Sequence, residues 1–194
     1  MTRDDAYKLM TQMIQNNNLR KHGVAVEAIM RSLCNYLKEK HPELPEAEFD
    51  EEEWAIVGLL HDADYELIEK DPKRHTLVTE EKLREIGGVS DRIINGIKAH
   101  HDGIKEGRDN YLEKAVYAAD ELSGLITACA LVKDKKLSNV TVETVMKKFP
   151  EKSFAAGAKR EQILACEKEL EIPLAEFVKI ALTAMQNISD ELGL

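Results

Sequence analysis

One stretch of the chain joins a strongly apolar run to ionisable side chains, Trp54-Ala-Ile-Val-Gly-Leu-Leu-His-Asp-Ala-Asp-Tyr-Glu66. The acidic residues just before it, Asp50 to Glu53, suit the positive N-terminal end of a helix, so we expect a helix over about residues 51–61. Its apolar run ends at His61-Asp62, and burying such a pair is costly without partners or a metal. The stretch therefore predicts a helix that carries ionisable groups into the core.

Helical periodicity recurs on both sides of this stretch. Of the 194 residues, 43% are hydrophobic and only 5% are aromatic, with ten Gly and five Pro, a composition that favours helix over strand. No segment shows the alternation expected of a strand. We expect an all-α fold, with helices over about residues 3–16, 20–40, 51–61, 75–86, 90–101, 110–133, 141–149, 152–170 and 173–192.

Turn and capping residues indicate where several of these helices begin and end. Gly87-Gly88 should stop one helix, Ser90 should cap the next, and Thr141 should cap a later one. The composition changes at residues 134–140. We therefore expect a helical domain over residues 1–133 and a C-terminal helical extension over residues 134–194 that packs on it.

Charge and cysteine content limit the class of protein. The net charge of −9 argues against non-specific nucleic-acid binding, although a local cationic pocket still suits a small phosphorylated substrate. The three cysteines are far apart, without a CxxC motif, and indicate buried thiols in a reducing compartment. Neither a signal peptide nor a long apolar segment is present. We expect a cytoplasmic protein that does not enter a membrane.

Four more residues place a His or Asp on an apolar helix face or at a helix end: His22, His75, His100 and Asp120. Asp120 is the most telling, because it lies in the apolar run Val116–Ile126, where an acid is costly unless paired. One of these residues alone would be read as structural. A shared cation explains all of them together with His61-Asp62, since imidazole and carboxylate are common metal ligands.

The order His…His-Asp…His…His…Asp resembles the HD-domain superfamily, whose members are mostly metal-dependent phosphohydrolases. The resemblance covers about residues 20–130, and its most specific parts are Leu59–Glu66 and Asp120–Ile126. Phe154-Ala-Ala-Gly157 and Arg160-Glu-Gln-Ile163 are similar to the helical extension of small HD hydrolases with an HD-x-D-Y-E sequence. The resemblance implies an HD-type helical bundle that hydrolyses a small phosphorylated molecule, such as a nucleotide.

The same resemblance implies roles for individual residues. His22, His61, Asp62 and Asp120 match the ligands of a first metal. His75 and His100 match the extra ligands of binuclear members, in which Asp62 would bridge two ions. The implied cofactor is one or two divalent ions of Mn, Fe, Co, Ni, Mg or Zn.

Other residues near the ligands are candidates for water activation and substrate binding. Besides Asp62, we expect Asp64 or Glu66 to orient or deprotonate the attacking water. Basic residues lie near the ligands, and Arg74 and Lys98 are the first candidates to bind substrate, followed by Arg160. His101 matches the second His of a His-His pair and is a candidate to bind substrate. We favour the alternative, in which it lies behind the ligands or on the surface.

Other functions stay open. Cyclic-dinucleotide phosphodiesterases of the superfamily carry a Lys after the His-Asp pair and a Gly-Tyr-Pro motif after the His-His pair. Here those positions read Asp64-Tyr65 and Gly103-Ile-Lys-Glu106, so we do not expect that activity. An HD-fold di-iron oxygenase and a non-catalytic metal- or ligand-binding module are the two alternatives. A homodimer is one candidate assembly.

Overall fold

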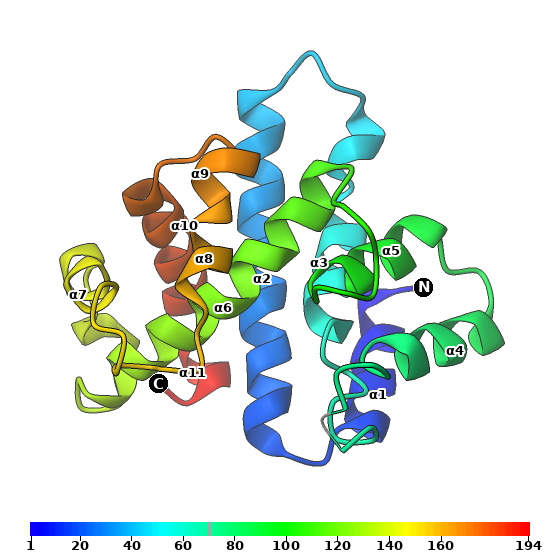
Figure 1. The fold of residues 1–194 in the computed structure, drawn as a ribbon, viewed down its shortest axis with the longest axis horizontal. Helices are drawn as coiled ribbons and strands as arrows, with labels where there is room; N and C mark the ends of the chain where they lie inside the picture. Colours follow the sequence, from blue (N-terminus) through cyan, green and yellow to red (C-terminus); the bar gives the residue numbers. More distant parts are fainter. Residues whose placement is uncertain (70) are drawn as a thin grey trace.

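The computed structural model describes residues 1–69 and 71–194, and within these ranges the fold is all-α, as predicted (Figure 1). The described residues form no strand, and the only β-type contact is an isolated bridge between Asp102 and Lys105. None of the helices in the described ranges has the length and apolar character needed to cross a lipid bilayer. The helices are α1 (Arg3–Met13), α2 (Asn17–Lys40), α3 (Glu51–Leu60), α4 (Leu77–Ile86), α5 (Asp91–Ala99), α6 (Tyr111–Leu131), α7 (Val142–Lys148), α8 (Arg160–Ile163), α9 (Ala165–Glu169), α10 (Leu174–Asn187) and α11 (Ser189–Leu192), with 3-10 turns η1 (Glu46–Phe49) and η2 (Leu137–Asn139).

The predicted helix caps are present. The Ser90 side chain accepts a hydrogen bond from the backbone N–H of Ile93 at the start of α5. Thr141 forms a capping box with Thr144 at the start of α7. Gly87 follows α4 with a φ of 73°, a left-handed conformation that a residue without a side chain adopts at little cost.

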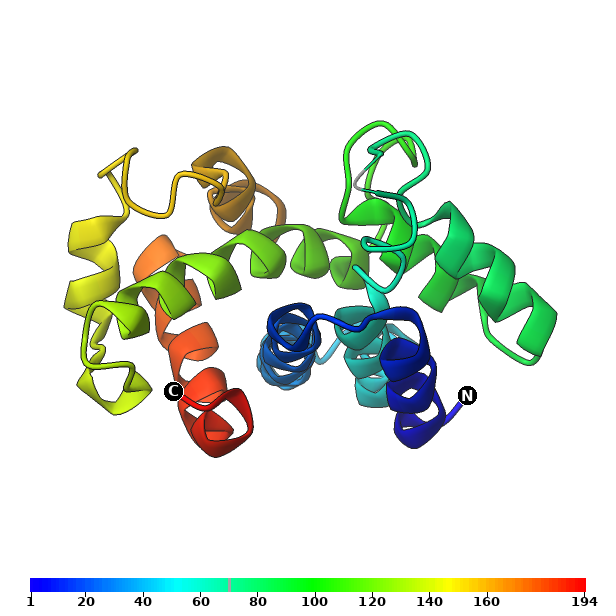
Figure 2. The same cartoon turned by 90° about the horizontal axis from the view of Figure 1, so that it is seen from below.

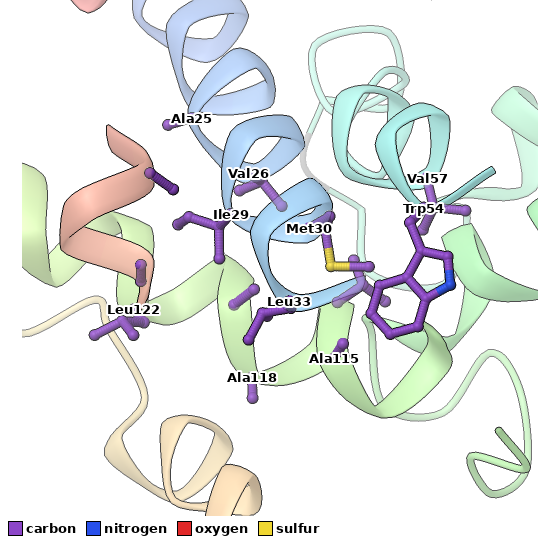
Figure 3. Close-up of a cluster of buried hydrophobic side chains, with 14 of the residues drawn as sticks. Ala25, Val26, Ile29, Met30, Leu33, Trp54, Val57, Ala115, Ala118 and Leu122 are labelled. Carbon is purple, nitrogen blue, oxygen red and sulfur yellow. The ribbon is translucent and has the colours of Figure 1, made fainter. Parts of the chain in front are cut away.

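Helix α2 lies at the centre of the bundle. It packs against α3 on one side and against α6 and α10 on others, so that both parts of the chain share one buried apolar cluster. Ile29, Met30 and Leu33 of α2 are fully buried and point toward this cluster, with Trp54 of α3 close by (Figure 3). Each such side chain contributes about 1.5–3 kcal/mol to the stability of the fold.

Two glycines bring α2 and α3 unusually close together. A Cβ at Gly58 would lie 2.9 Å from backbone atoms of Glu27, and one at Gly23 would lie 2.9 Å from the Leu59 carbonyl oxygen. Any larger residue at these positions would force the helices apart. The close contact sets the distance between the residues next to it, His22 on α2 and His61 at the end of α3.

The C-terminal extension differs from its prediction. Residues 152–159 form turns, and the single helix expected over 152–170 is replaced by the short helices α8 and α9, which meet at Leu164. The expected last helix is also divided, at Ile188, between α10 and α11. Figure 2 shows α6 crossing the molecule from the C-terminal extension to the side of α4 and α5. The helix therefore connects the two parts of the chain. The boundary at residues 133–134 stays a prediction.

Candidate metal centre

Five helices bring the predicted ligands together. His22 lies in the second turn of α2, Asp120 lies in the middle of α6, and His61-Asp62 directly follows α3. His75 precedes α4, and His100 directly follows α5. Helix ends and helix faces thus converge on one point, where His61, His75 and His100 are almost completely buried.

The first cluster consists of His22, His61, Asp62 and Asp120. Nε2 of His22 lies 3.0 Å from Nε2 of His61 and 3.0 Å from Oδ1 of Asp120. Oδ2 of Asp62 lies 3.5 Å from Nε2 of His22 and 3.6 Å from Nε2 of His61. All four residues therefore aim one ligand atom at the same small volume.

The second cluster consists of Asp62, His75 and His100. Nε2 of His75 lies 2.9 Å from Nε2 of His100. The other oxygen of Asp62, Oδ1, lies 3.2 Å from His75 Nε2 and 3.4 Å from His100 Nε2. Asp62 thus turns one oxygen toward each cluster.

These spacings fit a metal ion. Ligand atoms about 2.0–2.2 Å from a common ion lie roughly 3.0–3.6 Å from one another in tetrahedral or octahedral geometry. The distances in both clusters fall in or next to this range. Two uncharged imidazole nitrogens 2.9 or 3.0 Å apart without a shared ion would need a proton between them. The donor set of nitrogen and carboxylate oxygen suits Zn, Mn, Fe, Co or Ni.

Each histidine is held by its other ring nitrogen. Nδ1 of His61 contacts the Gly58 carbonyl oxygen at 2.8 Å, and Nδ1 of His100 contacts the Ile97 carbonyl oxygen at 2.6 Å. For His22, Nδ1 lies 3.0 Å from the Ser123 hydroxyl, which itself donates to the Asp120 carbonyl oxygen. Such outer partners keep Nδ1 protonated and Nε2 free to bind a metal.

The carboxylates control the protonation of the imidazoles. Burial alone would lower the pKa of His61, but Asp62 and Asp120 outweigh it and raise the pKa to about 9. Burial acts in the same direction on His75, where Asp62 and Asp64 raise the pKa to about 9. Conversely, burial would raise the pKa of Asp120, yet the histidines around it hold that pKa well below its usual range. A cation that enters the centre therefore replaces protons on His61 and His75.

An open cavity of about 380 Å³ gives access to the centre. His101 lines it together with the candidate ligands, and the ring of this half-buried residue lies 5.1 Å from that of His75. Its Nδ1 is buried and has no hydrogen-bond partner among the residues that the structure describes. Two charged residues that line this cavity, Glu121 and Lys159, are not among the predicted site residues. Glu121 directly follows the candidate ligand Asp120, and Lys159 lies between the two segments of the extension, Phe154–Gly157 and Arg160–Ile163, that carry the family resemblance.

The two carboxylates expected to act on water have other contacts. Asp64 is fully buried and accepts hydrogen bonds from His75 Nδ1 and from the backbone N–H groups of Thr76, Val78 and Thr79. Its role in this arrangement is to position His75. Glu66 accepts hydrogen bonds from the backbone N–H groups at positions 15 and 16, in the turn between α1 and α2. Neither carboxylate lines the cavity, so their contacts lend no support to a role in water activation.

The basic residues predicted to bind substrate do not line the cavity either. Lys98 forms an ion pair with Glu80 at 2.7 Å, and Arg74 has an exposed side chain that does not line the cavity. Arg160 donates to backbone carbonyl groups of residues 149, 151, 154, 155 and 158. This arginine therefore organises the turns before α8, which explains why they do not continue as a helix. The cation that these turns bring to the cavity is Lys159.

The comparisons with known proteins agree with this geometry. A family model described as "HD domain" matches residues 19–125, which is more than half of the chain and includes every residue of the two clusters. No curated protein and no solved structure matches the sequence. The C-terminal extension, including Lys159, lies outside the matched range.

Proposed function

The chain belongs to the HD domain family, and on this premise we propose that it is a metal-dependent phosphohydrolase that acts on a small phosphorylated substrate. The family match and the His/Asp clusters support divalent metal binding and metal-dependent hydrolysis. Beyond metal-dependent hydrolysis, we propose that water attacks phosphorus and that the centre holds two metal ions.

The observation that carries the proposal is the orientation of Asp62. Its Oδ2 faces His22 and His61, while its Oδ1 faces His75 and His100. A carboxylate placed this way can bridge two cations, with His22, His61 and Asp120 completing one set of ligands and His75 and His100 the other. A divalent ion in such a site supplies a water of lowered pKa and neutralises phosphoryl oxygens.

The chain itself contributes groups that bind the phosphate. Lys159 is the only lysine or arginine, among the described residues, that lines the cavity of the centre. Its backbone N–H donates to Oε2 of Glu121 at 3.0 Å, which fixes the turn next to Asp120. The Lys159 side chain is half exposed and lies only loosely against Glu121, with Nζ 3.8 Å from Oε1. Its ammonium group is thus available to a phosphoryl oxygen.

His101 is a further lining residue of the cavity. Burial lowers the pKa of His101, so its ring is neutral at physiological pH and can donate or accept one hydrogen bond. His101 lines the cavity, so this neutral ring is available to a polar group of the substrate. We assign His101 to the orientation of substrate, in agreement with its place beside His75.

The proposal is tested with the purified, metal-reconstituted protein on a panel of phosphate esters. We expect release of phosphate with Mn²⁺ or Co²⁺, and loss of nearly all activity in His61→Ala. The matched control is His41→Ala, which removes a histidine that pairs with Glu43 and stacks on Tyr111, away from both clusters. Equal activity in His61→Ala and the wild type would refute the proposal.

The same ligand set would also suit iron, so the oxygenase alternative is tested on the same protein. Anaerobic loading with Fe²⁺ followed by exposure to oxygen should leave the ester hydrolysis as the only turnover if the proposal is correct. Oxygen consumption coupled to product formation, with a mixed-valent di-iron signal and no phosphate release, would favour the oxygenase. A protein that gains no thermal stability from Mn²⁺, Fe²⁺, Ni²⁺ or Zn²⁺ would be a non-catalytic module.

A further inference from the structure

A second cavity, of about 390 Å³, opens on the other side of His22 from the cavity of the centre. It lies between the first turns of α2, the C-terminal half of α6 and α11. Apolar side chains such as Leu131 form much of its wall, while Asn18 and Thr127 supply hydrogen-bonding groups. This combination of apolar walls and a few polar groups is typical of sites for organic ligands.

An intermediate hollow joins this cavity to the metal centre. The hollow shares His22 and Gly124 with the second cavity, and it shares Asp120, Glu121 and Gly157 with the cavity of the centre. The three spaces therefore lie next to one another along α6, past the candidate ligands His22 and Asp120. The second cavity, which lies beyond these ligands and extends from Gly124 to Lys135, is called the trough below.

Gly124 lies in the middle of α6, where glycine is unfavourable for a helix. The other glycines inside helices, Gly23, Gly58 and Gly96, are explained by close contacts, because a Cβ there would lie 2.9 Å or less from a neighbouring atom. At Gly124 a Cβ would meet nothing within 4 Å. Helix packing thus gives no reason for a glycine, whereas its missing side chain leaves the trough open.

The far end of the trough carries positive charge. Lys21 and Lys135 both line it, and no acidic side chain does so. Neither lysine forms an ion pair with a described residue, although the protein carries a net charge of −9. Two unpaired cations in one hollow of an acidic protein favour an anionic ligand.

We propose that the trough binds the alcohol part of the substrate, an extended organic group that ends in a second anionic group near Lys21 and Lys135. This inference rests on the proposed function, in which the scissile phosphate lies at the metal centre. The substrate class is a phosphate ester with two anionic groups separated by an organic body, such as a nucleoside or sugar bisphosphate. The second anionic group binds as a charged ligand and takes no part in the reaction.

The first experiment fills the trough. The activity ratio is kcat/KM for adenosine 3′,5′-bisphosphate divided by kcat/KM for the small ester phenyl phosphate, measured with the Mn²⁺-loaded protein. We expect Gly124→Leu to lower this ratio by about tenfold or more, with Gly124→Ala in between, because a leucine side chain occupies the space of the organic group. Leucine also favours the helix, so the melting temperature should not fall. The control is Thr183→Leu, on the exposed face of α10.

The second experiment removes the charge. We expect the double variant Lys21→Gln/Lys135→Gln to lower kcat/KM for the bisphosphate by about tenfold relative to adenosine 5′-monophosphate. The control is Lys168→Gln, an exposed lysine outside the trough. Binding of inorganic phosphate to the double variant, measured by calorimetry, reports on the metal centre, because the charges of Lys21 and Lys135 are removed.

The outcomes separate the two proposals. A fall in both ratios supports the trough as the substrate site. Hydrolysis of esters with ratios that are unchanged in the Gly124 and lysine variants overturns this inference and leaves the proposed function intact. Loss of activity on all esters to the same extent also overturns it. Absence of ester hydrolysis and of phosphate binding in the wild type overturns the proposed function and this inference with it.

Discussion

The buried carboxylate of Asp64 accepts a hydrogen bond of 2.9 Å from Nδ1 of His75. This contact turns Nε2 of His75 toward Oδ1 of Asp62, 3.2 Å away. Asp64 also accepts three backbone N–H groups at the start of α4. One side chain thus holds both the helix and the ring of a candidate ligand.

Asp64→Asn replaces one acceptor oxygen with an NH₂ group that faces donors. We expect a loss of about 2–4 kcal/mol in the free energy of unfolding, because buried donors lose their partner. Metal affinity at the cluster of His75 should fall by about 10–100-fold, since the ring is no longer held. Urea unfolding and metal titration measure the two effects. Asp134→Asn, at an exposed position, is the control, and equal behaviour of the two variants would contradict this role for Asp64.

Metal content tests the division into two clusters. We expect about two Mn²⁺ ions per chain in the wild type and about one in His75→Ala, because the first cluster keeps all four of its ligands. Elemental analysis after removal of excess metal gives these ratios, and His41→Ala should match the wild type. A wild type that holds a single ion, with His75→Ala unchanged, would show that the centre is mononuclear.

The pH dependence follows from the raised pKa of His61 and His75. Both pKa values rise from 6.5 to about 9, so in the metal-free protein their contribution to stability is complete below pH 6.5 and is lost as the pH rises through 9. Metal ions must displace these protons and therefore bind better as the pH rises. We expect the melting temperature of the metal-free protein, prepared with a chelator, to fall as the pH rises from 6.5 to about 9. The increase in melting temperature that Mn²⁺ causes should grow over the same range. An increase that is independent of pH would contradict the raised pKa values.

Lys159→Gln tests the cation in the cavity. We expect a fall of about tenfold in kcat/KM with little change in stability, because the side chain is half exposed and its loss removes one charged contact to phosphate. Lys152→Gln, an exposed lysine of the preceding turns, is the matched control. Equal kinetics in the two variants would exclude Lys159 from phosphate binding.

Arg160→Ala should act mainly on stability. Removing the guanidinium leaves several carbonyl groups of residues 149–158 without a donor, and we expect a loss of about 2–4 kcal/mol in the free energy of unfolding. Arg160→Lys should restore little, since an ammonium group cannot match the fork of a guanidinium. Wild-type stability combined with a higher KM in Arg160→Ala would instead favour the substrate role expected from the sequence.

Much of the protein was predictable from the sequence, because local patterns act through local physics. Apolar spacing of 3.6 residues, Ser90 and Thr141 as caps, and Gly87 as a stop determine most helices without reference to the rest of the chain. The ligand set was also predictable, since an acid such as Asp120 within an apolar run needs a partner wherever that partner lies.

Only the tertiary structure decided which charged groups reach the centre. Lys98 and Arg74 are near ligands in the sequence, but neither lines the cavity. The helix α5 turns Lys98 to another face, where it pairs with Glu80, and Arg74 lies in the exposed turn before α4. Lys159 is distant in sequence and lines the cavity because Arg160 gathers the turns before α8. The sequence by itself determined most of the helices and the candidate metal ligands, whereas long-range packing, which no local pattern encodes, decided what surrounds them.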